Sequence, residues 1–306
     1  MNKKHLLILI LGMLMFAGLA VGIIWMLAGG NRTPVVQAQP ETVQPDRAED
    51  QSKKADEAKL ASLKAAQAGD AVDLEGLSQQ QLRSLFFSSA LTSEQIEQIT
   101  GVTFLPDQDF ITTDQLKYIK VLHTGFDGQT MVGELIVNET IADDIENIFY
   151  ELYLEQYPIE QIRLASVYKG DDYTNMVNNN TNAFSFRLSD GYGIVEHEHS
   201  LGLAVDFNPL YNPYIKIGDD ETESVWPPES QPFQNRSNLQ DHMISHDDAA
   251  WKIFTKYGFD WGGDWENGVK DYQHFEKYDH IPISQTYYIG NVLKAREQQE
   301  QANASQ

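Results

Sequence analysis

The chain has 306 residues, enough for one good-sized globular domain with extensions. Its 45 Asp and Glu residues against 22 Lys and Arg residues give a formal net charge of -23. Because binding to phosphates needs a basic surface, we expect no nucleic-acid partner. The chain has no cysteine, which excludes disulfides, thiolate catalysis and cysteine metal sites. Any metal must therefore be held by His, Asp and Glu.

The N-terminus carries an apolar run over residues 6–28, preceded by Lys3 and Lys4. The run is long enough to cross a bilayer, whereas the apolar part of a secretory signal usually has about 7–15 residues. We therefore expect residues 1–30 to form a cytoplasmic tip and a single-pass transmembrane anchor. The rest of the chain would then lie outside the cytoplasm, at the cell membrane. The alternative is a protein secreted after cleavage behind Ala38.

The next segment, 31–84, is predicted to be a linker or stalk, because its first half is polar and rich in Pro, Gln and Glu. Residues 55–68 within it consist of helix-forming residues and are expected to form a stalk helix. The folded domain is predicted over 85–290, with 85–132 as its N-terminal extension. The polar tail 291–306 is expected to be disordered.

Apolar patterns within the domain predict short helices and strands. A short helix starting at Thr92 is expected to bury Ile96 and Ile99. A strand over Gly133–Val137 follows the turn at Asp127-Gly128. Thr140 is predicted to cap a helix that ends before Pro158 and has this apolar face: Ile141, Ile145, Ile148, Phe149 and Leu152.

The C-terminal half continues this mixture. Residues 162–168 and 203–207 are predicted to be strands. Ser245 is expected to cap a helix that runs through Tyr257 and stops at Gly258. Since no βαβ unit repeats, the pattern predicts an α+β fold with a small, largely antiparallel sheet flanked by helices.

Two segments carry residues in the pattern of a metal site. In the first, His199 precedes Asp206, a carboxylate in the apolar strand 203–207, where burial is costly unless the charge is paired or bound to a cation. In the second, Asp271 and His274 are three residues apart. Two imidazoles and one carboxylate are the ligand set of a catalytic zinc with an open position for water, on which Asp271 would act. The alternative is a core histidine hydrogen-bonded to a buried aspartate.

These motifs resemble those of the VanY/VanX-type D-alanyl-D-alanine metallopeptidases, the group that includes lysostaphin and the hedgehog signalling domains. The similarity rests on His199-x6-Asp206 with an internal Gly-x-Ala. The segments Phe259-Asp-Trp-Gly-Gly-Asp-Trp265 and Asp271-Tyr-Gln-His274-Phe resemble more narrowly the branch with L-alanyl-D-glutamate endopeptidases of bacilli and phage endolysins. So does Asn208-Pro-Leu-Tyr-Asn-Pro213. The resemblance covers about residues 133–287 and implies a hedgehog/D-Ala-D-Ala-peptidase-like fold.

The resemblance also implies a role for each matching residue. His199, Asp206 and His274 correspond to the Zn2+ ligands, and Asp271 stands where the family has its general base. Arg187 resembles the arginine that faces the substrate and the developing oxyanion; the alternative for it is a surface salt bridge.

Two positions depart from the family pattern. His197 stands where the family usually has Ser and is a residue that supports the ligands from behind, an exposed residue or an alternative ligand. Asn175 likewise replaces a frequent Ser and affects the expected substrate contacts.

The function implied is a membrane-anchored, extracytoplasmic zinc peptidase that hydrolyses peptidoglycan stem peptides. It would act as an L-alanyl-D-glutamate endopeptidase or as a D,D-carboxypeptidase. The alternative is a non-catalytic cell-wall-binding or scaffold protein on the same fold. The other histidines are expected to be surface or structural groups: His5, His123, His242, His246 and His280.

Overall fold

The computed structural model describes residues 45–278, apart from 107–110, 190–192, 196–197, 219, 221 and 267. The expected membrane anchor and the C-terminal tail therefore lie outside the described residues. Among the helices that are described, none combines the length and the apolar character needed to cross a bilayer.

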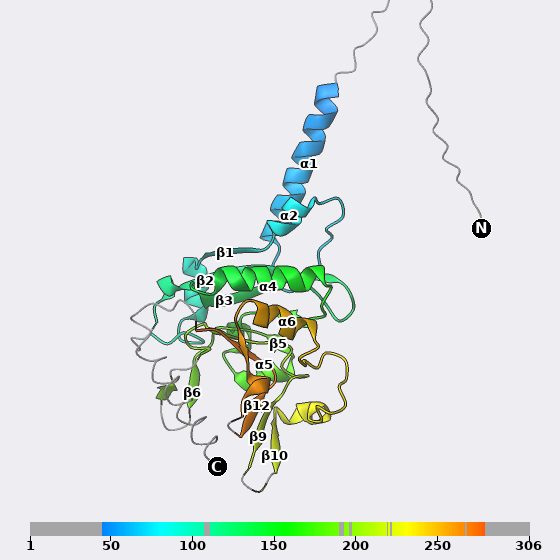
Figure 1. Ribbon diagram of the computed structural model, residues 1–306. Helices are drawn as coiled ribbons and strands as arrows, with labels where there is room; N and C mark the ends of the chain where they lie inside the picture. Colours follow the sequence, from blue (N-terminus) through cyan, green and yellow to red (C-terminus); the bar gives the residue numbers. More distant parts are fainter. Residues whose placement is uncertain are drawn as a thin grey trace, which may run out of the picture. The chain divides into compact units, whose positions relative to one another are not determined.

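The structure is α+β, as the sequence predicts, with helices between short strands (Figure 1). The described α-helices are α1 (Pro45–Ala65), α2 (Gln79–Arg83), α3 (Ser93–Ile99), α4 (Ala142–Leu154), α5 (Asp172–Val177) and α6 (Ala249–Lys256). Short 3-10 helices are η1 (Thr113–Gln115), η2 (Ala165–Tyr168), η3 (Pro228–Phe233) and η4 (Gly262–Asp264).

The strands form several small sheets where the sequence led us to expect one. The first sheet is antiparallel, in the order β1 (Phe87–Ala90), β2 (Leu116–Thr124) and β3 (Thr130–Asn138). The second has the order β10 (Glu223–Trp226), β9 (Tyr214–Ile217) and β12 (Val269–Asp271). The third has the order β11 (Asp260–Trp261), β13 (His274–Glu276) and β8 (Ala204–Asp206).

Two pairs of strands complete the described part. The parallel pair is β4 (Gln161–Ile162) with β5 (Asn180–Thr181), and the antiparallel pair is β6 (Arg187–Ser189) with β7 (Gly193–Val195). Because most of these strands have only two to four residues, few backbone hydrogen bonds join them and no single large sheet forms.

One apolar core connects the first sheet to the strands of the third. The predicted apolar face of α4 is fully buried, and α4 packs along the β1-β2-β3 sheet (Figure 1). The same core includes Val205 of β8, Phe275 of β13 and Phe254 of α6. The rings of Phe254 and Phe275 are stacked with centroids 4.2 Å apart. The third sheet is therefore anchored by one of its faces in the main core.

The residues before 85 also contribute to the packed part of the chain. Leu63, near the end of α1, is buried in the core. Gly69 N donates to Val132 O and Val72 N to Thr130 O, so this segment hydrogen-bonds along the edge strand β3. Only the first part of α1, through residue 58, is uniformly exposed where side chains are described.

Several local predictions are confirmed and others are wrong. Thr92 caps α3 with a reciprocal bond to Gln95, as expected. The helix α4 begins at Ala142, and the Thr140 hydroxyl instead donates to Asn138 Oδ1, so Thr140 is not its cap. The cap of α6 is Asp248, whose Oδ1 accepts from Ala250 N, and not Ser245.

The strand predicted over residues 162–168 is also largely wrong. Only Gln161 and Ile162 pair with another strand, because β5 offers a partner of just two residues. The chain then turns into η2, which ends at Lys169 in the left-handed conformation with φ of 59°. The predicted strands over 133–137 and 203–207 are present as β3 and β8.

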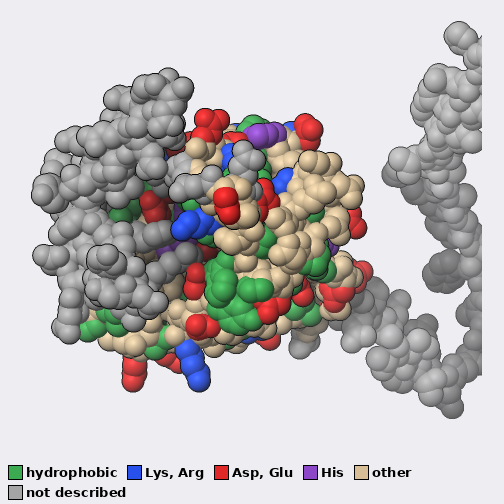
Figure 2. Space-filling view, turned by 90° about the horizontal axis from the view of Figure 1, so that it is seen from below, with side chains coloured by type: hydrophobic (Ala, Val, Ile, Leu, Met, Phe, Trp, Pro, Cys, Tyr) green, Lys and Arg blue, Asp and Glu red, His purple; other side chains and the backbone are tan. Residues whose placement is uncertain are grey.

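The surface reflects the acidic composition. On the face shown in Figure 2, Asp and Glu side chains are spread among polar and hydrophobic ones.

Candidate metal centre

His199 lies in the turn before β8 and is completely buried. Its Nδ1 is 2.6 Å from the carbonyl oxygen of Ala183. Since a carbonyl only accepts, Nδ1 carries the hydrogen and the lone pair is on Nε2. The turn needs Gly202, which has φ of 70° and whose added Cβ would lie 2.6 Å from Asn138 N. This close approach explains the Gly between His199 and Asp206.

Asp206 and His274 are brought together by strand register. In the antiparallel pairing of β8 with β13, His274 is opposite Asp206 and Phe275 is opposite Val205. Side chains alternate between the faces of a strand, so the apolar pair enters the core and the polar pair lies on the other face. The same two strands thus supply core residues and candidate ligands.

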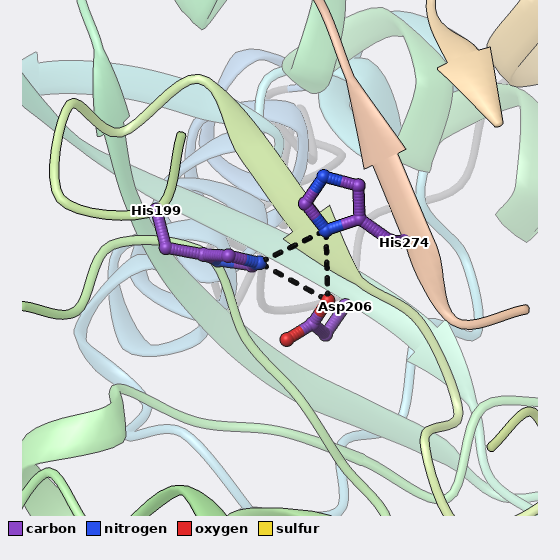
Figure 3. A group of neighbouring side chains, drawn as sticks. All are labelled: His199, Asp206 and His274. Carbon is purple, nitrogen blue, oxygen red and sulfur yellow. Dashed lines mark hydrogen bonds and ion pairs between the residues drawn. The ribbon is translucent and has the colours of Figure 1, made fainter. Parts of the chain in front are cut away.

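The three side chains predicted as ligands converge on one point (Figure 3). His199 Nε2 is 3.1 Å from Asp206 Oδ1 and 3.2 Å from His274 Nδ1. His274 Nδ1 is 3.4 Å from Asp206 Oδ1. All three residues are buried.

These separations fit a common metal ion. Donor atoms bound to one tetrahedral Zn2+ at about 2.0–2.2 Å lie about 3.3–3.6 Å from one another. The triangle of two imidazole nitrogens and one carboxylate oxygen is close to this size. The arrangement can hold a divalent metal with a fourth position for a further ligand, whereas a single hydrogen-bonded His–Asp pair would not need the second imidazole.

Glu276 is a residue of this centre to which the sequence analysis gave no role. It is completely buried, and its Oε2 is 3.1 Å from His274 Nε2. Tyr278 OH donates to Glu276 Oε2 at 2.7 Å and also lies 2.6 Å from Glu198 Oε1. Burial alone would lower the pKa of His274, but its bonds to Asp206 and Glu276 hold that pKa well above its usual value. Because the Glu276 carboxylate accepts from His274 Nε2, that nitrogen carries a hydrogen, and Nδ1 faces the triangle.

Glu198, His274 and Glu276 form a second group whose donor atoms are close enough for a metal. It would use Nε2 of His274 in place of Nδ1. The first group offers two imidazoles and therefore fits the zinc ligand pattern better.

Asp271, predicted as the general base, ends β12 and is 7% exposed. Gln273 Nε2 donates to its Oδ1 at 3.1 Å. Asp271 is held near His274 by Gly262, because a Cβ added there would be 3.0 Å from Asp271 Cβ and 3.2 Å from His274 Cβ. The same Cβ would be only 2.4 Å from Asp271 O. A side chain at position 262 would thus push β12 away from β13.

The aromatic residues of the Trp-Gly-Gly-Asp-Trp segment pack around the centre. The ring of Trp265 lies 5.2 Å from that of His274 between centroids. Trp261 Nε1 donates to Tyr272 O, which fixes the turn between Asp271 and His274. This segment therefore packs on His274 and holds the turn that precedes it.

Arg187 is described only by its backbone, which begins β6 and pairs with Val195. Ser185, two residues earlier, donates its N–H to His199 O at 3.2 Å. The backbone leading to Arg187 thus runs beside His199, while its side chain lies outside the described residues.

The remaining predicted positions are outside this cluster. His123 is buried, with Nδ1 on Ile159 O, which fits the structural role expected for it. His246 is exposed and bonded to Asp264, and His242 stacks on Phe126. Asn175 is buried in α5 and bonds to Asn180. The positions outside the described residues are His5, His197 and His280.

Comparison with known proteins supports a peptidase. Residues 196–277 match the family model described as D-alanyl-D-alanine carboxypeptidase. The matched segment contains His199, Asp206, Asp271 and His274, the residues that surround the centre. A search of curated proteins and one of solved structures found no match.

Proposed function

We propose that this protein is a zinc-dependent peptidase that hydrolyses the stem peptides of peptidoglycan. The observation that carries the proposal is the triangle of His199, Asp206 and His274, with separations suited to Zn2+. The match to a carboxypeptidase family over the same segment supports a peptide substrate from the cell wall. A hedgehog/D-Ala-D-Ala-peptidase-like fold is part of this proposal.

The ligand residues would hold Zn2+ through His199 Nε2, Asp206 Oδ1 and His274 Nδ1. Bound Zn2+ supplies a Lewis acid that polarises the scissile carbonyl and lowers the pKa of water toward about 7. Asp271 accepts a proton from the attacking water and returns it to the leaving amine. Gln273 holds the Asp271 carboxylate in one orientation by donating to Oδ1.

Other residues position the reacting groups. Arg187 would donate to the carbonyl oxygen as negative charge develops there. Glu276 fixes the ring of His274, and Tyr278 supports Glu276. Burial of these groups excludes water from the side of the centre that faces the core.

Two bonds of the stem peptide are candidates for cleavage. The resemblance of Trp261-Gly-Gly-Asp-Trp265 to its branch favours the L-alanyl-D-glutamate bond. The resemblance to VanY-type enzymes favours removal of the terminal D-Ala. Mass spectrometry of digested muropeptides distinguishes these outcomes, since one releases a whole stem peptide and the other a single alanine.

We further propose that residues 6–28 anchor the protein in the cell membrane, with the peptidase domain outside the cytoplasm. The length of this apolar run and the lysines before it support the proposal. Cell fractionation, together with protease accessibility of the domain in spheroplasts, tests it. A soluble form that begins after Ala38 would favour secretion instead.

The enzymatic proposal is tested with three variants of the full-length chain. His274→Ala is expected to lose bound Zn2+ and all muropeptide hydrolysis. Asp271→Asn is expected to keep Zn2+ and lose turnover by about 100-fold or more, the usual contribution of a general base. His242→Ala is the matched control, because it removes an imidazole that stacks on Phe126 and is outside the centre. Hydrolysis by His274→Ala at the wild-type rate would refute the proposal.

A further inference from the structure

A row of side chains extends from Asp271 across the second sheet. In the register of β12 with β9, Asp271 is opposite Tyr214. In the register of β9 with β10, Tyr214 is opposite Trp226. Residues directly opposite in neighbouring strands point to the same face. Asp271, Tyr214 and Trp226 therefore share one face of this sheet.

The outer end of the row is an exposed aromatic pair. Trp226 is 44% exposed and Tyr173 of α5 is 38% exposed, and these two are the aromatic members of the exposed large apolar residues in the described part of the chain. Their ring centroids are 5.4 Å apart with an interplanar angle of 46°. Tyr173 OH donates to Glu229 Oε1 at 2.5 Å, which holds its ring in place.

Trp226 of this pair lies on the same face of the sheet as Asp271, the proposed general base. The helix that carries Tyr173 also contacts the site, since Gln273 Nε2 lies 3.7 Å from Met176 Sδ. Aromatic side chains that are exposed and in contact with one another are typical of a binding surface.

The spacing within the row indicates what part of a substrate reaches it. Two steps between neighbouring strands place the Cα atom of Trp226 about 10 Å from that of Asp271. In peptidoglycan, the amino sugar is joined through a lactyl group to the L-Ala of the stem peptide. If the L-Ala–D-Glu bond is at the centre, one residue of about 3.5 Å and the short lactyl link separate it from the sugar.

The terminal D-Ala bond is much farther from the sugar. Four stem residues then intervene, which is about 14 Å of extended chain before the lactyl link. With the terminal D-Ala bond at the centre, the sugar would therefore lie beyond Trp226. With the L-Ala–D-Glu bond at the centre, the sugar would reach Trp226.

We propose that Trp226 and Tyr173 form a subsite that binds the N-acetylated amino sugar next to the stem peptide. Their exposed rings offer flat apolar faces, on which a pyranose ring can stack with its C–H groups. This subsite makes the protein an endopeptidase for the L-Ala–D-Glu bond of peptide still attached to glycan. The inference rests on the proposed function.

The test compares two ligands that differ only in the sugar. Full-length, zinc-loaded Asp271→Asn protein is titrated by calorimetry with a disaccharide-tetrapeptide and with the free tetrapeptide. In this background, Trp226→Ala is expected to weaken binding of the sugar-bearing ligand by about 10-fold and to leave binding of the free peptide unchanged. Ile217→Ala is the matched control, because Ile217 has similar exposure on the opposite face of the same sheet and is expected to alter neither affinity.

The outcomes separate this inference from the proposed function. Equal weakening of both ligands by Trp226→Ala, or weakening of neither, overturns the sugar subsite. So does preferential removal of terminal D-Ala from glycan-linked peptides by the wild-type enzyme. A wild-type protein that binds the sugar-bearing ligand more tightly through Trp226 but hydrolyses no muropeptide would leave the subsite standing and refute the peptidase.

Discussion

Replacement of Glu276 by Gln tests whether a buried carboxylate positions the metal ligand His274. Glu276 Oε2 accepts from His274 Nε2 at 3.1 Å and from Tyr278 OH at 2.7 Å. Gln keeps the volume and one carbonyl oxygen at this position but removes the charge. A hydrogen bond to a charged group contributes about 1.5–3 kcal/mol, against about 1 kcal/mol for a neutral pair.

The difference of about 0.5–2 kcal/mol predicts that Glu276→Gln weakens Zn2+ binding by about 2- to 30-fold. The upper part of this range overlaps with the 10- to 100-fold effect typical of residues that orient a metal ligand. The dissociation constant is measured by competition with a chromophoric chelator at constant pH. Tyr278→Phe is the control for the surroundings, because it keeps the Glu276 carboxylate on His274 and is expected to change the affinity by less than about 3-fold.

Asp206→Asn distinguishes between the two groups of residues that could hold a metal together with His274. If the metal is held by His199, Asp206 and His274, this variant loses Zn2+ binding far more than Glu276→Gln does. If Glu198, His274 and Glu276 hold it, the order is reversed. An affinity for Zn2+ in Glu276→Gln equal to that of the wild type would refute the positioning role.

Two further predictions concern packing and pH. Gly262→Ala is expected to reduce muropeptide hydrolysis by about 100-fold and to destabilise the fold by about 1–3 kcal/mol, because its Cβ would lie 2.4 Å from Asp271 O. Gly218→Ala is the control and should leave both unchanged in the same assays, because its nearest neighbours would be the side-chain oxygens of Asp220 and Thr222 at 3.0 and 3.2 Å. Burial lowers the pKa of His123 to about 4, so the unfolded chain binds the extra proton between pH 6.5 and 4 and stability falls as the pH falls through this window. His123→Gln should remove up to about 3 kcal/mol of that loss in urea unfolding at pH 7 and pH 4.5, and an unchanged pH dependence would contradict the assignment.

The sequence predicted the candidate ligands because polar side chains are costly to bury in apolar segments, and the structure brings these side chains together. A carboxylate in the apolar strand around Asp206 needs a partner, and His199 with the small residues between them indicated one. The sequence did not predict how His274 meets Asp206, because the register of two three-residue strands depends on the turns at Gly202 and Gly262. These turns are determined by contacts with Asn138 and Asp271, which are distant in sequence.

Glu276 was missed although a signal was present. It is two residues after His274 in a strand, so both side chains must lie on the same face. The errors at helix ends have a different cause, since the Thr140 hydroxyl bonds to Asn138 instead of the helix, and Ser245 competes with the nearby Asp248. Ser245 accepts only from Asp247 N, while Asp248 reaches the helix itself. Which of several nearby polar residues caps a helix depends on local side-chain hydrogen bonds, and the pattern of apolar positions does not predict these bonds.

The candidate ligands and the residues of the proposed sugar subsite differ in how closely the core fixes their positions. Phe275 and Val205 bury one face of β13 and β8, and the opposite face presents His274 and Asp206. The positions of the candidate ligands therefore follow from core packing, and a change in the core that moves either strand also changes the triangle of His199, Asp206 and His274. Trp226, at the outer edge of the sheet of β9, β10 and β12, has no such constraint, because its side chain is exposed and packs on Tyr173. Substitutions at this edge can alter which substrates bind while the ligand triangle stays intact.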